Sequence, residues 1–403
     1  MLLPLGIRPA GNSQAQMLIA MHTTLYDFSP LLRLLMVGAA VAVVPLLWVG
    51  LRNRDASTSQ RLRALTLATL FLTFDLVMFG AFTRLTDSGL GCPDWPGCYG
   101  NASPLGAHIE ISAAQLAMPT GPVTHGKAWV EMLHRYWASG VGGLIIVLAS
   151  VGWWLSTGMR KGRAPAPNPW WASVTLLWVC IQGAFGALTV TMKLFPAIVS
   201  LHLLGGYVLL ALLTVQAVQW THISRTTGPV AISRPLRVGI VLALSMLTLQ
   251  AASGAWVSTN YAVLACTEFP QCQGQWWPDM AFSSGFELWR GLGMAADGSH
   301  IPFAALTAIH VVHRMLALVA ALTLVALCFA LWRHQALKLL SRALLGLLLL
   351  QIATGVSNAV LDWPLPAAVL HTGGAGALVV VLVALLVGTT RGNATFPIRR
   401  TTP

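Results

Sequence analysis

Four histidines and one glutamate stand in or next to long apolar segments of this sequence. His134 follows Glu131 by three residues, and on a helix two residues at that spacing share a face. The other histidines are His202, His313 and His371. Ionisable side chains at membrane depth are costly to bury, and in membrane proteins they usually mark functional sites. These five residues are therefore the strongest indication of chemistry in the sequence.

The composition indicates an integral membrane protein. Of 403 residues, 56% are hydrophobic and only 9% are charged, whereas a soluble domain has about 25% charged residues. The formal net charge of +12 does not indicate nucleic-acid binding, because Lys and Arg stand in short clusters between apolar segments. This pattern is typical of cytoplasmic loops. We therefore expect the chain to contact membrane lipid and no nucleic acid.

The sequence predicts an all-α membrane protein with nine spanning helices. Each apolar segment is long enough to cross a hydrocarbon core roughly 30 Å thick, and such long segments favour helices over a barrel. The predicted spans are 31–51, 64–84, 131–156, 170–192, 197–220, 236–258, 304–332, 338–360 and 366–389.

The basic residues predict the orientation of these helices. If nine helices alternate in direction, five basic clusters lie on one side, which the positive-inside rule makes the cytoplasm. The long loops 85–130 and 259–303 then lie outside, with the N-terminus, and the C-terminus lies inside. We expect the bacterial cytoplasmic (inner) membrane. The clusters are Arg52, Arg54, Arg61 and Arg63; Arg160, Lys161 and Arg163; Arg225, Arg234 and Arg237; Arg333, Lys338 and Arg342; and Arg391, Arg399 and Arg400.

Matching residues recur at nearly constant separations along the chain. Each long outer loop has two cysteines with five residues between them, Cys92 and Cys98 in the first loop and Cys266 and Cys272 in the second. Corresponding cysteines are 174 positions apart; the first and third of the four histidines are 179 apart, and the second and fourth 169. Such separations indicate an internal duplication, with two four-helix bundles of the same topology about the membrane normal.

This duplication predicts how the chain is divided. We expect a tail, one extra transmembrane helix and a cytoplasmic loop over 1–63. The N-terminal four-helix half follows over 64–235, and the C-terminal four-helix half over 236–390. Residues 391–403 form a cytoplasmic tail.

The depths of the histidines indicate what they bind. His134 and His202 lie about five and six residues into their predicted spans, which both run from outside to inside. At about 1.5 Å per residue their imidazoles have similar depths. Two imidazoles from separate bundle helices can hold one iron porphyrin between them. His313 and His371 repeat the arrangement in the second half.

Two arginines and one missing motif bear on this haem hypothesis. Arg135 and Arg314 each follow a histidine and could contact haem propionates near the outer interface. The sequence has no C-x-x-C-H motif, which argues against covalent attachment. Two alternatives stay open. The histidines could be packed residues bonded to backbone carbonyls, or His310 and His313 could bind zinc or copper.

The two halves differ one turn before the first histidine of each. The first half has Glu131, and the matching residue of the second half is His310. Electron transfer alone does not need this carboxylate, which suits proton handling or charge stabilisation at a reacting group. The structural alternative is a glutamate bonded to Arg135 or to the loop.

The cysteines of each outer loop are expected to form a disulfide within that loop, because both pairs face the oxidising side. A redox role, in which an exposed disulfide exchanges with a thiol carrier, is the alternative.

Several motifs of the chain closely resemble those of the haem A synthase family. They are FGAFTRLTDSGLGCPDWPGCYG at 79–100, EMLHRYW at 131–137, His202, IHVVHRM at 309–315 and LHTGGAG at 370–376. The resemblance covers about 64–389. It implies eight helices in two duplicated halves and oxidation of the C8 methyl group of haem O to the formyl group of haem A, for cytochrome oxidase.

The resemblance also implies a role for each candidate residue. Glu131 becomes the catalytic acid, His134 and His202 become the ligands of the substrate haem, and His313 and His371 become the ligands of a haem b cofactor. The outer-loop cysteines match members that have cysteines in both loops.

The implied cofactors and partners follow from that reaction. They are haem b, haem O as substrate, molecular oxygen or water as the oxygen source, an unidentified electron donor, haem O synthase and cytochrome oxidase assembly factors. The extra helix at 31–51 departs from the family pattern. The alternative function is a dihaem cytochrome b that only carries electrons, although such a carrier has no need for the difference between Glu131 and His310.

Overall fold

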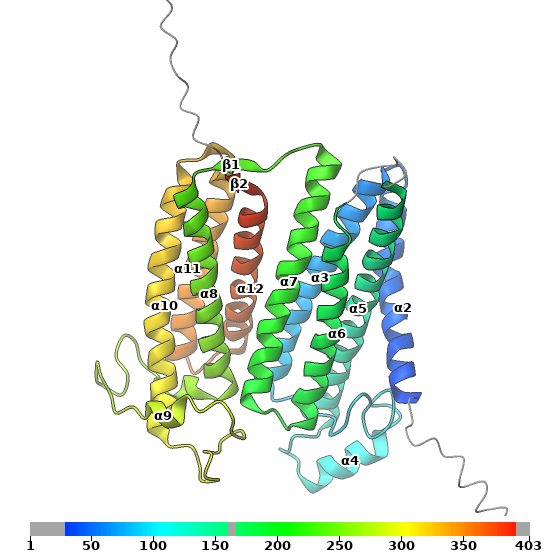
Figure 1. Ribbon diagram of the computed structural model, residues 1–403. Helices are drawn as coiled ribbons and strands as arrows, with labels where there is room; N and C mark the ends of the chain where they lie inside the picture. The colour runs from blue at the N-terminus through cyan, green and yellow to red at the C-terminus, as the bar shows by residue number, and fades with distance from the viewer. Residues whose placement is uncertain (1–28, 160–166, 392–403) are drawn as a thin grey trace, which may run out of the picture.

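The computed structural model describes residues 29–159 and 167–391, and in these ranges nine helices are long and apolar enough to cross a membrane (Figure 1). The prediction of an all-α integral membrane protein is therefore confirmed. The spanning helices are α2 (Ser29–Arg52), α3 (Thr58–Leu85), α5 (His125–Met159), α6 (Trp170–Thr191), α7 (Pro196–Arg225), α8 (Arg234–Thr259), α10 (Phe303–Trp332), α11 (Lys338–Val360) and α12 (Leu365–Val387). The short helices are α4 (His108–Ala117), η1 (Ala262–Ala265), α9 (Phe282–Gly285) and η2 (Gln335–Leu337).

Local sequence explains where several helices begin. Ser57 and Gln60 form a capping box at the start of α3, each side chain accepting a backbone N–H of the other residue. Ser233 accepts the Leu236 N–H at the start of α8. The helix α5 begins six residues before its predicted span because the Thr124 hydroxyl accepts the Lys127 N–H, a cap that an analysis of hydropathy does not detect.

The spanning helices form two groups of four with the same arrangement. In the first group, α3 and α6 each contact both α5 and α7, so α5 and α7 stand at opposite corners of a bundle. In the second group, α8 and α11 each contact both α10 and α12, which again occupy opposite corners. The remaining helix, α2, packs mainly on α5, and α12 joins the groups by packing on α3 and α7 (Figure 1).

Residues at matching positions of the two halves meet where these groups join. Arg84 donates to the backbone carbonyl of Ser258 at 2.7 Å, and Tyr261 donates to the Asp87 carboxylate at 2.5 Å. Both pairs are separated by 174 positions, as the loop cysteines are. Burial is the main cause that raises the pKa of Tyr261; the hydrogen bond to Asp87 adds to it and Arg84 opposes it. Equivalent residues in contact indicate that a pseudo-twofold axis passes between α3 and α8.

A short parallel strand pair was not expected from the sequence. The strand β1 (Val230–Ile232) pairs with β2 (Thr389–Arg391), with Val230 opposite Thr389. Arg237 supports the pair by donating to the carbonyls of Leu386 and Thr389. The pair ties the chain just before α8 to the end of α12, a contact across about 160 residues that local patterns cannot show. Arg391 therefore lies in a strand, where the sequence predicted the start of a tail.

The two ends of the bundle carry different segments. The long loops 85–130 and 259–303, with α4 and α9, lie at one end, here the loop end, and β1 and β2 lie at the other, here the strand end (Figure 1). This arrangement agrees with helices that alternate in direction. The basic residues Arg160, Lys161, Arg163, Arg399 and Arg400 lie outside the described residues, as do positions 1–28 of the predicted N-terminal tail.

Candidate functional site

The structure places the four histidines on the diagonal helices of the two groups. His134 on α5 and His202 on α7 are near enough for their charges to interact, and so are His313 on α10 and His371 on α12. All four side chains are half-buried. Each half of the protein thus places two electrostatically interacting imidazoles on the helices at opposite corners of a bundle.

Every one of these imidazoles packs against a glycine of a neighbouring helix. A side chain on any of the four glycines would meet the ring at its Cε1 atom. The distances from an added Cβ to Cε1 are 3.0 Å for Gly80 and His134, 3.5 Å for Gly186 and His202, 3.0 Å for Gly254 and His313, and 3.1 Å for Gly355 and His371. No role for these glycines was evident from the sequence, although Gly80 and Gly254 are 174 positions apart, as the cysteines are, and Gly186 and Gly355 are 169 apart, as His202 and His371 are.

Gly254→Val is expected to weaken haem binding in the second half. The branched side chain would force the His313 ring to move, and overpacking of this kind costs about 1–3 kcal/mol. The matched control is Gly239→Val on the same helix, where the nearest atom of another helix to an added Cβ is Leu327 Cδ1, at 3.8 Å. Haem content per protein and the optical spectrum of both purified variants provide the measurement. Equal haem content in the two variants would contradict the packing argument.

The surroundings of the histidines fit an iron porphyrin held between two imidazoles. Nδ1 of His134 and of His202 is buried without a hydrogen-bond partner among the described residues, although each residue as a whole is only half-buried. Nδ1 of His313 and of His371 faces a hydroxyl group. Three or more His, Cys, Asp or Glu side chains do not cluster anywhere in the described ranges. The zinc or copper alternative for His310 and His313 therefore has no third side-chain ligand there.

Glu131 has a different neighbourhood from the histidines. Its side chain is buried, and one carboxylate oxygen accepts the Cys92 backbone N–H at 2.7 Å. The other oxygen accepts from the Arg135 guanidinium at 2.5 Å. Arg135 also donates to the carbonyl of Gly97 at 2.5 Å. Glu131 therefore has both partners that its structural alternative named, and it connects α5 to the first outer loop.

The matching part of the second half also connects a helix to a loop, but without the acid. Arg314 donates to the carbonyls of Gln271 at 2.9 Å and Cys266 at 3.0 Å. His310 is buried, and its Nδ1 has no partner among the residues described. Both arginines therefore direct donors at loop carbonyls, and contact with haem propionates by Arg135 or Arg314 stays a prediction.

The cysteines are bonded in pairs within their own loops. The S–S distance is 2.07 Å for Cys92–Cys98 and 1.96 Å for Cys266–Cys272. Within each disulfide-closed loop an acidic side chain, two residues after the first cysteine, accepts backbone N–H donation from just beyond the second cysteine. Asp94 accepts from Tyr99 and Gly100, and Glu268 accepts from Gly274. The loops thus share a compact design, which holds them against the helices that carry His134 and His313.

An open pocket of about 410 Å³ lies between α3, α5 and α12. Its lining residues come from α3, α5 and α12 and are Asp75, Met78, Phe79, Phe82, Trp137 and Val369. The Phe79 ring stacks on the His134 ring with 6.1 Å between centroids. Phe79 thus links this mostly apolar and aromatic pocket to the His134 ring.

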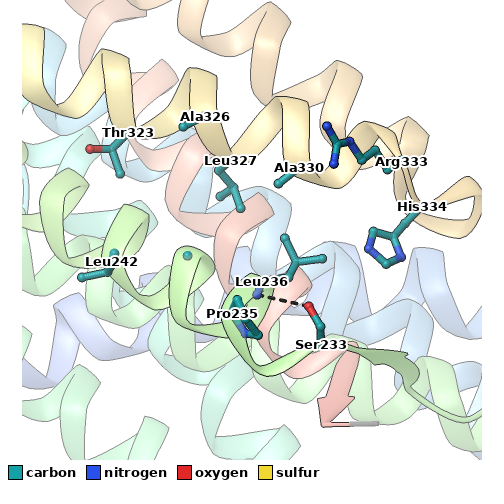
Figure 2. Close-up of a pocket in the computed structure, with 11 residues that line it drawn as sticks. Ser233, Pro235, Leu236, Leu242, Thr323, Ala326, Leu327, Ala330, Arg333 and His334 are labelled. Atoms are coloured by element: carbon teal, nitrogen blue, oxygen red, sulfur yellow. Dashed lines mark hydrogen bonds between the residues drawn. The ribbon is translucent and has the colours of Figure 1, made fainter. Parts of the chain in front are cut away.

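A second cavity, of about 580 Å³, lies between α8 and α10 (Figure 2). Figure 2 shows Arg333 and His334 near Ser233 at the strand end of this space. The lining begins at Thr323, about 15 Å along α10 from His313 at the usual rise of a helix. It is thus separate from the histidine pairs.

Comparison with known proteins places this geometry in a family. The family model described as COX15-CtaA, cytochrome oxidase assembly protein, matches residues 63–383. The chain belongs to this family. The matched COX15-CtaA region contains Glu131, the four histidines and both disulfides, and it leaves α2 outside.

Several relatives carry the printed name heme A synthase. The protein from Shewanella oneidensis is 38% identical over 317 residues, which are 79% of this chain and 93% of that protein. The protein from Rhizorhabdus wittichii is 27% identical over 352 residues, 83% of this chain and 95% of that protein. The protein from Granulibacter bethesdensis is 27% identical over 360 residues, 83% of this chain and 90% of that protein.

Proposed function

We propose that this chain is a haem A synthase, a membrane oxidoreductase that converts haem O to haem A for cytochrome oxidase. The observation that carries the proposal is its membership of the COX15-CtaA family, together with a relative named heme A synthase that matches over 93% of its own length. The electron-carrier alternative is not favoured, because the relatives are named as synthases.

The two histidine pairs take different roles in this proposal. His134 and His202 hold the substrate haem O, and His313 and His371 hold haem b. When bound, haem b supplies one-electron redox chemistry. The pair that includes His134 is chosen as the substrate site because Glu131 stands one turn away on the same helix. The matching residue of the other half, His310, has no carboxylate to offer.

The reaction oxidises one carbon of the substrate in stages. A first hydroxylation converts the C8 methyl group to a hydroxymethyl group, and a second gives a geminal diol. The diol loses water to give the formyl group, so the methyl carbon loses four electrons overall. The inserted oxygen comes from molecular oxygen or water, and the electron balance is completed by an unidentified partner in the membrane.

Glu131 is the side chain with the chemistry to assist these steps. Its carboxylate can accept the proton lost from the reacting carbon or stabilise positive charge that develops there. In the structure its oxygens are occupied by the Cys92 N–H and by Arg135. These donors orient the carboxylate, while the His pair positions the porphyrin and the buried surroundings limit access of water.

Haem analysis of cells tests the function directly. Deletion of the gene is expected to abolish haem A and to accumulate haem O, and the parent gene should restore haem A. The measurement is chromatography of extracted haems. A deletion strain that retains the parent's haem A content would refute the proposed function, since an electron carrier can be lost without loss of haem A.

The proposed setting is the bacterial cytoplasmic membrane, with the loop end outside. Supply of haem O by haem O synthase and release of haem A to cytochrome oxidase assembly factors are the partnerships that this reaction needs. The basic clusters within the described residues support the orientation, because they lie between or after helices on the side opposite the long loops.

Labelling of single cysteines tests the orientation. Leu116→Cys in α4, where the leucine is 82% exposed, should react with a membrane-impermeant maleimide in intact spheroplasts. Arg225→Cys at the end of α7 is the matched strand-end position and should react only after permeabilisation. The parent chain controls for the two cysteines outside the disulfides, Cys180 and Cys328. The reverse labelling pattern would show that the loop end faces the cytoplasm and would contradict the proposed orientation.

A further inference from the structure

We propose that Ser253 and Thr354 are positioning residues that make the second histidine pair the tighter of the two haem sites. In the first half the matching positions are occupied by Phe79 and Phe185. The inference rests on the proposed function in one respect, which is that each histidine pair holds one haem. It adds a reason, in this chain's own residues, why one haem is retained and the other is exchanged.

Ser253 determines which nitrogen of His313 carries the proton. Its hydroxyl lies 2.8 Å from Nδ1 of His313 and donates its only hydrogen to the Gln250 carbonyl, also at 2.8 Å. With its hydrogen on that carbonyl, the serine oxygen is left to accept from the imidazole, which favours the ring proton on Nδ1. Nε2 then presents a lone pair, the form that an iron ligand requires. The Gln250 amide nitrogen lies 3.1 Å from Nδ1 and 3.3 Å from Nε2 of the same ring, and its Oε1 is buried without a partner among the described residues. A proton on Nδ1 therefore requires the Gln250 amide to be turned over, so that its oxygen accepts beside Nδ1.

Thr354 acts on His371 in the same way from a different helix. Its hydroxyl lies 3.0 Å from Nδ1 of His371 and donates to the Leu350 carbonyl at 2.7 Å. The threonine oxygen is thus left to accept the Nδ1 proton. The Gln351 backbone also interacts with this ring, and its side-chain amide donates to the His371 carbonyl at 2.8 Å. Both the ring and the backbone of His371 are therefore held.

The first half lacks both hydroxyl groups. Phe79 stands 174 positions before Ser253, and Phe185 stands 169 positions before Thr354, the separations that relate the two halves elsewhere. Accordingly, Nδ1 of His134 and Nδ1 of His202 are both buried with no partner among the described residues. Leu76 likewise replaces Gln250. The difference is systematic, since both histidines of one half have a hydroxyl acceptor and neither histidine of the other half does.

This difference has a direct consequence for ligand strength. An acceptor on the far nitrogen of a metal-bound imidazole fixes its tautomer and orientation and makes it a stronger donor, and loss of such a partner typically costs about 10- to 100-fold in metal affinity. Imidazoles without an acceptor can adopt either tautomer and bind more weakly. A substrate haem must enter and its product must leave, whereas a cofactor must survive many turnovers. The two hydroxyl groups belong to the pair that is proposed to hold the cofactor haem.

Haem-transfer rates measured in single-site proteins test the proposal. Full-length chain carrying His202→Ala retains only the second pair, and chain carrying His371→Ala retains only the first. Transfer of haem from each purified protein to excess apomyoglobin is followed in the Soret band. Haem is expected to leave the second pair more slowly than the first.

The hydroxyl variants are then compared in the His202→Ala background. Thr354→Val and Ser253→Ala should each accelerate haem loss by about 10- to 100-fold and should shift the reduction potential of that haem to a more positive value. Thr354→Ser and Ser253→Thr keep the hydroxyl group and should retain the parent's rate and potential. A purely structural effect would not be rescued by these conservative changes. In the His371→Ala background, Phe185→Thr introduces the missing acceptor and should slow haem loss.

Opposite results overturn the proposal. It fails if the hydroxyl-deleted variants keep the parent's rate and potential, if the conservative variants lose haem as fast as they do, or if haem leaves the second pair faster than the first. Absence of haem from the second pair in the His202→Ala protein would refute both the site assignment and this inference. Normal haem A in cells that lack the gene would refute the proposed function alone, and the haem-transfer rates would still test this inference.

Discussion

Glu131→Gln is expected to give a protein that binds both haems and makes little haem A. Glutamine keeps the size of the side chain and an oxygen that can accept the Cys92 N–H, but it removes the negative charge. Loss of an acid–base group typically costs about 10²- to 10⁴-fold in rate. Haem O or a partly oxidised intermediate should accumulate. The measurement is chromatography of extracted haems beside an optical spectrum of the same preparation.

The ion pair with Arg135 supplies the control for this experiment. Arg135→Gln breaks the same 2.5 Å contact while leaving the carboxylate in place. If Glu131 only anchors Arg135 and the first loop, the two variants should lose haem A to a similar degree. A much larger loss in Glu131→Gln assigns the effect to the charge of the carboxylate. Haem A made at the parent's rate by Glu131→Gln would show that the residue is structural.

His313→Ala and His371→Ala are each expected to remove the stable b-type spectrum from the purified protein. Each variant deletes one of two proposed iron ligands, and the remaining imidazole would hold the iron from one side only. His134→Ala and His202→Ala should leave this spectrum in place, because they alter the other bundle. Haem content and the low-spin optical spectrum provide the measurement.

His310 offers a matched control on the same helix. It lies one turn before His313 and is buried, but the haem assignment gives it no iron ligand role. His310→Ala should therefore keep the b-type spectrum, whereas His313→Ala should lose it. If His310→Ala loses the spectrum and His313→Ala keeps it, the ligand assignment is wrong.

Apolar length and repeated spacing made most of the framework predictable from the sequence. Nine long apolar segments predicted nine spanning helices, because a helix is the element that satisfies every backbone group within the bilayer. The cysteine and histidine separations indicated the duplication, and the structure places His134 with His202 and His313 with His371. These features depend on local composition or on simple counting along the chain.

The features that the sequence analysis missed depend on contacts between distant segments. Nothing near Val230 indicates that it pairs with Thr389. Ser253 and Thr354 have the appearance of ordinary small polar residues in apolar helices, and their role depends on the imidazoles that other helices place beside them. The pairing of Glu131 with Arg135 is only one alternative from the sequence, because helical spacing shows that two residues share a face but not where a side chain points.

The contacts between Arg84 and Ser258 and between Asp87 and Tyr261 have a consequence for how such a protein can diverge. In a symmetric homodimer, two copies of one residue face each other across a twofold axis, so a single substitution changes both sides of the contact. An arginine there would face an arginine, and an aspartate an aspartate. Fusion of the halves into one chain removes that constraint, and here an acid faces a phenol and a guanidinium faces a carbonyl. When the halves are joined in one chain, a substitution in one half leaves the sequence of the other unchanged, so the two can take different functions. Two identical subunits encoded by one gene cannot do this.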